Sequence, residues 1–434
     1  MKKILLSCCR RLEKISDGDE MKEKHIKEGI ALSRVYGEGE KIIGISLEFD
    51  EEIIKSKLDK NAFMISGRTI DKILVYQEFS YPDMPEKETG KYIVLKLNEQ
   101  ETEALTVYEM PRNNDRPGGI TNIRETHYEV KQLQEITTVQ GKRYPAGESI
   151  AIIKKKQPVV EHFRTYKFQL QNSDKEVVYN LYEPENINEN EKYPLVLFIE
   201  DAGVLSENPL VTLCQGLGAT IFASAKEQKK HPAFVLAPQF PGPDSLVEDD
   251  FSCTWEVAAA MELLKDIIKN YPIDVNRVYG TGQSMGCMTL CELSVRYPNV
   301  FGGCLLVGGQ WNPAIMDKAK EHNFWIVVSE GDKKAFPGMN MVAEVFENNG
   351  VPVGRAVLDA KADFDELNRT ICDLQKDGNH IHYTWFAGDS VIPEGVTPTP
   401  LLHHRNTWRV TYQLEALRDW LFGQLKRIEQ IKEQ

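Results

Sequence analysis

The chain has 434 residues and a formal net charge of −13 at pH 7. A chain of this length exceeds what one hydrophobic core usually serves, so two domains are expected. The excess of acidic residues disfavours nucleic acid and anionic membrane surfaces as partners. The hydrophobic and charged fractions, 41% and 27%, are typical of a soluble globular protein.

Eight cysteines are scattered along the chain without a C-x-x-C pair, which favours reduced thiols in a cytoplasmic protein. Cys287 and Cys291 have a spacing compatible with zinc, but no paired histidine motif accompanies them, so core packing is favoured and no metal is expected. Met1–Arg10 imitates a lipoprotein signal, yet its apolar core, Ile4–Leu6, is shorter than the roughly 7–15 residues that secretion needs. Secretion or lipoprotein anchoring is therefore the less favoured localisation.

The first part of the chain predicts a loosely structured leader over residues 1–35, because residues 11–35 are rich in charge. Apolar residues then alternate from Ile43 to Phe49, and this period of two predicts a half-buried strand. Further short strands are predicted near Thr69–Tyr76, Tyr92–Leu97 and Ser149–Lys154. Because no long helical period separates them, residues 36–157 are predicted to form an antiparallel β-sandwich.

From residue 158 to 434 the pattern changes to strands that alternate with helices. Continuous apolar runs predict buried strands at Pro194–Ile199, Phe234–Ala237, Cys304–Val307 and Phe324–Val328. Helical spacing predicts helices at Val257–Asn270, Gly286–Arg296, Asn340–Asn349 and, at the end, Tyr412–Ile428. This rhythm predicts an α/β fold with a doubly wound, mostly parallel sheet.

A G-x-S-x-G motif spans Gly282 to Gly286 and is the strongest chemical signal in the chain. A short strand pattern, Arg277–Thr281, precedes it, and helical spacing follows. A serine on a sharp turn between strand and helix is the nucleophile elbow of α/β-hydrolases, so Ser284 is the predicted nucleophile. The glycine spacing lacks the third glycine of a dinucleotide site, and no cofactor is expected.

In this fold an acid and then a histidine follow the serine along the chain. The acid should come just after a later strand, and Asp332 lies on the turn that follows Phe324–Val328. Glu330 on the same turn is the alternative. Asp363 and Asp365 follow no predicted strand and rank lower.

The histidine should follow the last strand, predicted at Ile381–Phe386. A proline-rich loop leads from this strand to His403 and His404, and we favour His404 as the general base, with His403 as the alternative. His380 and His382 alternate along the strand and are interpreted as structural residues.

An oxyanion hole needs two backbone N–H donors. One is expected from Met285, the residue after the nucleophile, and the other from Asp201 or Ala202, in the loop after Pro194–Ile199. Because Glu200 and Asp201 are both acidic, this loop is expected to disfavour anionic substrates.

Residues 162–427 resemble the predicted peptidase and esterase branch of the α/β-hydrolases, which is related to polyhydroxybutyrate-depolymerase-like and dienelactone-hydrolase-like enzymes. The matching stretches are Lys192–Phe198, His231–Gln239, Ile273–Tyr279 leading into the G-x-S-x-G motif, and Glu415–Phe422. Residues 36–155 resemble the N-terminal immunoglobulin-like domain of some of these esterases. One departure is Glu200, which stands where the family usually has histidine.

These observations predict a serine carboxylesterase that acts through an acyl-enzyme on small or oligomeric esters. A serine peptidase with the same residues and a catalytically degenerate binding protein are the alternatives, and Glu200 is the main support for the second. For the N-terminal domain, rigid scaffolding or contact between copies of the chain is preferred over walling the active-site mouth.

Overall fold

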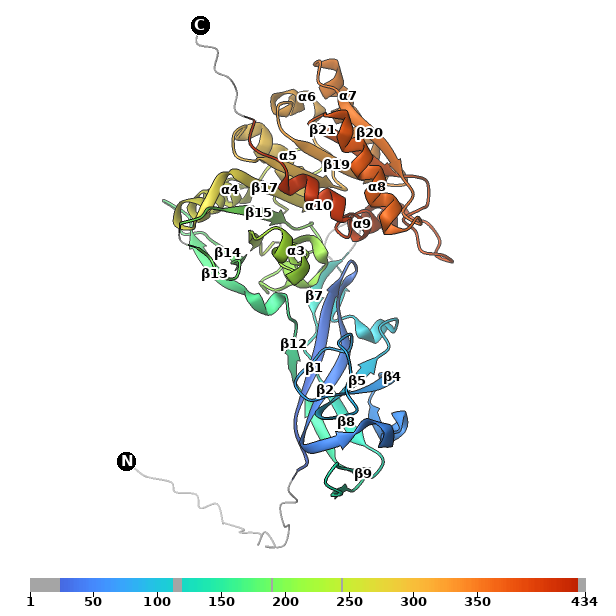
Figure 1. Ribbon diagram of the computed structural model, residues 1–434. Helices are drawn as coiled ribbons and strands as arrows, with labels where there is room; N and C mark the ends of the chain where they lie inside the picture. The colour runs from blue at the N-terminus through green and yellow to red at the C-terminus, as the bar shows by residue number, and fades with distance from the viewer. Residues whose placement is uncertain (1–23, 112–118, 189, 243–244, 428–434) are drawn as a thin grey trace, which may run out of the picture.

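The computed structural model describes residues 24–111, 119–188, 190–242 and 245–427, which form two domains (Figure 1). An all-β domain comes first, and a larger domain of helices around a sheet follows it. Residues 1–23 of the predicted leader lie outside the described residues. Among the residues described, no helix is both long and apolar enough to span a membrane.

The N-terminal domain encloses its core between a five-stranded sheet, in the order β12-β1-β2-β5-β4, and a three-stranded sheet, β11-β8-β3. Two small hairpins, β6–β7 and β9–β10, complete it. The strands are β1 Ile26–Tyr36, β2 Gly39–Ile54, β3 Phe63–Ile65, β4 Ile70–Tyr76, β5 Thr89–Leu97, β6 Val107–Met110, β7 Ile120–Ile123, β8 Tyr128–Gln132, β9 Ile136–Thr137, β10 Arg143–Tyr144, β11 Ser149–Ile152 and β12 Lys154–Lys156. The 3₁₀ helices of the chain are η1 Lys55–Lys57, η2 Lys60–Ala62, η3 Thr102–Ala104, η4 Val160–His162, η5 Asp317–Ala319 and η6 Gln375–Asp377.

The leader prediction is wrong for residues 26–35, which belong to β1 and pair with β2 along its length. The charged residues that suggested a leader, such as Lys27 and Arg34, lie on the more exposed positions of this strand. Small residues at Gly29 and Ser33 interrupt the apolar alternation, which hides the strand in the sequence.

The strand predicted around residues 43–49 is buried on both faces rather than on one. Ile45 and Leu47 face the main core of the domain. Ile43 packs on the opposite face with Leu32 and Val94. Because this second apolar cluster covers the other face of β2, neither face of the strand is exposed to solvent here.

The second domain is built on a nine-stranded sheet in the order β13-β14-β16-β15-β17-β18-β19-β21-β20. Strand β14 runs antiparallel to both of its neighbours, and all the other pairs are parallel. The strands are β13 Phe163–Gln169, β14 Glu176–Tyr182, β15 Tyr193–Ile199, β16 Phe234–Gln239, β17 Ile273–Gln283, β18 Gly303–Val307, β19 Phe324–Ser329, β20 Val353–Leu358 and β21 Ile381–Phe386. Three of them, β13, β14 and β20, have no counterpart among the strands predicted from sequence.

Helices cover both faces of this sheet (Figure 1). They are α1 Val211–Cys214, α2 Leu217–Thr220, α3 Ala225–Lys230, α4 Trp255–Asn270, α5 Met285–Arg296, α6 Pro313–Met316, α7 Ala335–Asn348, α8 Phe364–Leu374, α9 Pro400–Thr411 and α10 Glu415–Phe422. Successive residues of β15 alternate between the two cores: Leu195 and Leu197 lie in one, Val196 and Phe198 in the other. Burial on both faces explains why its sequence is continuously apolar.

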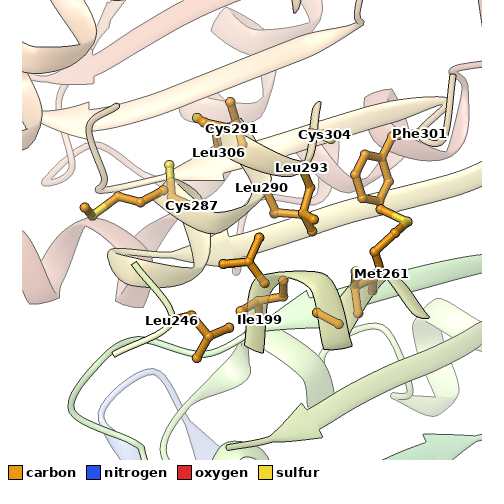
Figure 2. Close-up of a cluster of buried hydrophobic side chains, with 14 of the residues drawn as sticks. Ile199, Leu246, Met261, Cys287, Leu290, Cys291, Leu293, Phe301, Cys304 and Leu306 are labelled. Carbon is orange, nitrogen blue, oxygen red and sulfur yellow. The ribbon is translucent and has the colours of Figure 1, made fainter. Parts of the chain in front are cut away.

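Helix α5 starts directly after Ser284 and lies on a dense apolar layer, as Figure 2 shows for Leu290, Leu293, Phe301 and Leu306. Cys287 and Cys291 belong to the same buried layer, which agrees with their interpretation as core residues.

The predicted final helix, Tyr412–Ile428, is wrong in its bounds. Helix α9 ends at Thr411, the chain turns at Tyr412 and Gln413, and α10 runs only from Glu415 to Phe422. Arg418 of α10 is almost fully buried and donates to Glu227 of α3 at 2.7 Å and to the carbonyl of Tyr412 at 2.6 Å.

Replacement of Arg418 alone by Met should lower the free energy of unfolding by about 3 kcal/mol, because it leaves the Glu227 carboxylate buried without its cation. The double variant Arg418→Met with Glu227→Leu should recover a large part of this loss, since no buried charge remains. Urea unfolding of the three proteins checks this. A double variant no more stable than the single one would contradict it.

Candidate active site

Ser284 stands on the sharp turn between β17 and α5. Its φ of +53° lies in a region that non-glycine residues rarely adopt, as expected for a strained nucleophile elbow. Its N–H donates to Val307 at 2.9 Å, and its carbonyl accepts from Met288 at 3.0 Å. These bonds to β18 and α5 hold the strained backbone in place.

The two glycines of the motif permit a close approach between α5 and β15. A Cβ on Gly286 would overlap the carbonyl oxygen of Ile199, and one on Gly282 would lie 2.7 Å from the Gly286 backbone. The motif therefore brings the start of α5 against the loop that follows β15. That loop is the one from which the sequence predicts the second oxyanion donor.

His404 is the fifth residue of α9, and the structure brings it together with Ser284 and Asp332. Its Nε2 is 2.8 Å from Ser284 Oγ, and its Nδ1 is 2.5 Å from Asp332 Oδ2. A carboxylate that accepts from Nδ1–H leaves Nε2 free to accept a proton from the hydroxyl. Three residues that are far apart in the chain thus form the chain of hydrogen bonds that a serine nucleophile requires.

Asp332 is only 4% exposed. Burial alone would raise its pKa, but the hydrogen bond and the charge of His404, together with the N–H groups of Ala335 and Lys334, outweigh burial and hold the pKa below its usual value. Both N–H groups donate to Oδ1 at 3.0 Å. This carboxyl is therefore kept ionised and oriented toward the imidazole.

The alternative acid, Glu330, and the alternative base, His403, form no hydrogen bond with Ser284 or His404. Glu330 is exposed and accepts from the Gly388 N–H at 2.7 Å. His403 is buried, with Nδ1 3.1 Å from Ser329 Oγ and Nε2 3.0 Å from Asp389 Oδ1. His403 therefore anchors the start of α9 to β19 and to the loop before α9, and it makes no bond to Ser284.

His380 and His382 occupy structural positions, as the sequence predicts. His380 is 2.9 Å from the carbonyl of Lys320, and His382 stacks on Trp325 with a centroid distance of 4.4 Å.

The residues predicted for the oxyanion hole, Met285, Asp201 and Ala202, line one cavity together with Ser284 and His404. Met285 is the first residue of α5, and first-turn N–H groups have no acceptor within their own helix. The Asp201 carboxylate shapes its loop: it accepts from the Gly203 N–H and from the Gln283 amide, each at 2.8 Å. Gln283, which precedes the nucleophile, is thus a site residue that the sequence analysis missed.

Glu200 does not face this cavity. It is fully buried beneath the loop, accepts from the Phe240 N–H at 3.0 Å and lies 3.4 Å from the Thr212 hydroxyl. Burial raises its pKa to about 8, so the carboxyl is mostly neutral at pH 7. The expectation of a doubly acidic loop is wrong, because only Asp201 carries a charge there.

The cavity has a volume of about 500 Å³. Loops at the carboxyl ends of the parallel strands line most of it, which is where ligands bind in open α/β sheets. Trp408 also lines it, with its ring 4.9 Å from that of His404. Trp408 was not predicted, although it lies one helical turn after the histidine.

The N-terminal domain also contributes to the cavity, through Gly119, which directly precedes β7. The Thr121 N–H donates to the carbonyl of Gly203 at 2.7 Å, and Glu109 pairs with Arg405 at 2.5 Å. The β6–β7 hairpin therefore contacts both the loop after β15, which contains the predicted donors Asp201 and Ala202, and Arg405, the residue next to His404. The preference for a scaffolding role was wrong in this respect, because the domain forms part of the wall of the cavity.

Among the described residues, one cluster has ligand atoms close enough for a metal: Glu227, His231 and Asp419, within 4.8 Å of one another. Its carboxylates are already bound by cations, since Arg418 pairs with Glu227 and Lys230 with Asp419. Two positive charges at this position disfavour a metal ion, and we interpret the cluster as an ion-pair network between α3 and α10.

Comparisons with known proteins agree with this architecture. Residues 29–145 match the family model described as the esterase Ig-like N-terminal domain. A solved thermostable esterase is 23% identical with a TM-score of 0.77, and 92% of this chain and 100% of that chain are covered. The chain therefore carries an esterase-type immunoglobulin-like domain in front of an α/β-hydrolase fold.

More distant similarities are found to a feruloyl esterase module from Clostridium thermocellum and to an acylaminoacyl peptidase. The first is 14% identical with a TM-score of 0.41, and 62% of this chain and 91% of that chain are covered. The second is 12% identical with a TM-score of 0.41, and 91% of this chain and 60% of that chain are covered. Comparison with curated protein sequences gives no match.

Glu200→Gln should change how stability depends on pH. Because the folded pKa is raised from 4.5 to about 8, the native state holds a proton that the unfolded chain has lost in this interval. The stabilisation that this bound proton gives to the folded state is fully present below pH 4.5 and is lost as the pH rises to about 8. In this interval the free energy of unfolding falls by up to roughly 1.4 kcal/mol per pH unit. Glutamine does not titrate, so the variant should gain stability relative to the native protein from about pH 5 to about pH 8. Urea unfolding across this range checks it, and parallel pH profiles would contradict it.

Gly331→Ala should destabilise the start of α9, because a Cβ there would overlap the His403 ring. We expect a loss of about 1–3 kcal/mol in the free energy of unfolding, which is typical of overpacking. In a His403→Ala background the same change should cost much less. Chemical denaturation of the four proteins in this cycle measures the coupling, and an equal cost in both backgrounds would rule out the steric explanation.

Proposed function

We propose that the protein is a serine hydrolase that cleaves carboxylic esters through an acyl-enzyme on Ser284. The observation that carries this proposal is the continuous chain of hydrogen bonds from Ser284 through His404 to Asp332, at the wall of a cavity. The N-terminal domain matches a family model whose description names esterases, and this supports esters over amides as substrates.

In the proposed reaction, Ser284 Oγ attacks the ester carbonyl while His404 Nε2 takes its proton. The N–H of Met285 and one from the Asp201–Ala202 loop stabilise the negative charge on the carbonyl oxygen. His404 then protonates the leaving alcohol, and the acyl group stays on Ser284. A water molecule, deprotonated by His404, attacks the acyl carbon, so that the acid is released and the serine regains its proton.

Asp332→Asn should lower kcat on p-nitrophenyl butyrate by roughly 10⁴-fold, because the amide fixes the wrong tautomer of His404. Ser284→Ala should abolish turnover and labelling by a fluorophosphonate probe. Glu330→Gln, on the same turn as Asp332, is the matched control and should retain activity.

The same assays decide between the alternatives. Clear turnover of peptidyl p-nitroanilides without turnover of esters would favour a serine peptidase. A folded protein that is neither labelled at Ser284 nor active on either substrate would favour a degenerate binding protein. The buried position of Glu200 removes the main support for that second alternative, because its side chain does not replace a group in the cavity.

A further inference from the structure

A second cavity, of about 300 Å³, lies between the two domains and adjoins the candidate active site. Asp201, Gly203, Arg405 and Trp408 line both cavities. We call this second space the interdomain cavity. Its remaining walls come mainly from the β1–β2 turn, the β6–β7 hairpin and helix α9.

Helix α9 contributes side chains to both cavities. His404 and Trp408 are four residues apart and line the catalytic cavity. Arg405 and Arg409, also four residues apart, line the interdomain cavity. Of these four residues, His404 lines only the catalytic cavity and Arg409 only the interdomain cavity, while Arg405 and Trp408 line both, so α9 is a shared wall of the two cavities.

The acidic side chains of the interdomain cavity already have partners. Glu38 pairs with Lys41, and Glu109 pairs with Arg405, each at 2.5 Å. Asp201 accepts from the Gly203 N–H and the Gln283 amide. Each of these acids therefore has a closer partner than Arg409.

Arg409 is a partly buried cation that has Glu38, Glu109 and Asp201 nearby but no carboxylate in direct contact. Its guanidinium donates to Asn406 Oδ1 at 3.0 Å, and no carboxylate of the described residues forms an ion pair with it. Burial lowers its pKa, which reports the cost of holding the charge there. The β1–β2 turn packs closely on its backbone, because a Cβ on Gly37 would lie 2.9 Å from the Arg409 carbonyl oxygen.

A second cation, Arg124, lies at the exposed edge of this cavity, with its guanidinium 5.4 Å from the centre of the Tyr108 ring. The described structure gives it no carboxylate partner either. The lining of this cavity carries three arginines, Arg124, Arg405 and Arg409, against three acids, in a protein of net charge −13, and two of these arginines form no ion pair among the described residues.

We propose that the interdomain cavity binds a free carboxylate carried by the ester substrate, and that Arg409 is its principal contact. A guanidinium binds a carboxylate through two parallel hydrogen bonds, which matches this ligand better than a neutral group. The proposal rests on the proposed function and narrows its substrate class to anionic esters, such as half-esters of dicarboxylic acids. Arg409 then determines specificity and takes no part in the bond cleavage.

The test compares matched charged and neutral esters. One series holds the carboxylate on the acyl side: p-nitrophenyl hemisuccinate, hemiglutarate and hemiadipate against neutral p-nitrophenyl esters of equal chain length. The other series holds it on the alcohol side: the butyryl ester of p-hydroxybenzoate against that of its methyl ester. The proteins are wild type, Arg409→Gln, Arg409→Lys and, as a matched control, Arg369→Gln on α8, an exposed arginine that lines neither cavity.

We expect wild type to prefer the charged member in at least one series by about tenfold in kcat/KM, mainly through KM, as a charge-assisted hydrogen bond predicts. Arg409→Gln should remove that preference and leave the neutral esters within about threefold, while Arg409→Lys keeps part of it. Arg369→Gln should behave as wild type. A preference for neutral esters in both series, or an equal loss on charged and neutral esters in Arg409→Gln, would overturn the proposal.

A binding measurement separates this proposal from the esterase function. Calorimetric titration of Ser284→Ala with glutarate should show binding that is weakened about tenfold or more by the additional Arg409→Gln change. If no ester is turned over, binding that depends on Arg409 still supports a carboxylate site. Absence of such binding in a folded Ser284→Ala protein overturns it. Thermal unfolding verifies folding, and Arg409→Lys replaces Arg409→Gln if the latter does not fold.

Discussion

The proposed chemistry of this protein depends on where the N-terminal end of α9 is held. His404 is the fifth residue of this helix, and the hydroxyl of Ser284 gains its proposed base only if the imidazole lies within hydrogen-bond distance. Its position is fixed by the neighbouring His403, which is bonded to Ser329 and Asp389. The helix start is defined locally, because Thr399 accepts from the Leu402 N–H and Pro400 occupies the first helical position.

The N-terminal domain acts on the same helix and on the opposite wall of the cavity. Glu109 of the β6–β7 hairpin pairs with Arg405, next to His404. Thr121 of the same hairpin donates its N–H to the carbonyl of Gly203, in the loop after β15. The β1–β2 turn packs on α9 further along, at Arg409. One domain therefore contacts both the helix that carries the proposed base and the loop that carries a proposed oxyanion donor, so a displacement of the sandwich would alter both at once.

The parts of this arrangement that local sequence determines were predictable. The elbow at Ser284 follows from two glycines that allow a close approach, and the chain order of the fold led to Asp332 and His404, which the structure brings together with Ser284. The start of α9 was mistaken for the end of a loop, although Thr399 and Pro400 are a helix-start signal. Prolines earlier in the segment obscured that signal. Strand β1 was missed because Gly29 and Ser33 interrupt its period of two.

The contacts between the domains could not be derived in the same way, since the pairing of Glu109 with Arg405 joins residues almost three hundred positions apart and has no local signature. The loop after β15 shows how such contacts alter a prediction from sequence. Two acidic residues there suggested repulsion of anions, but tertiary burial makes Glu200 mostly neutral at pH 7, and Asp201 is bound by Gln283. The electrostatic argument against an anionic substrate is therefore reduced from two carboxylates to one, that of Asp201. Arg409 supplies an argument in favour of an anionic substrate, because it lines the interdomain cavity, which shares Arg405 and Trp408 of α9 with the cavity that His404 lines.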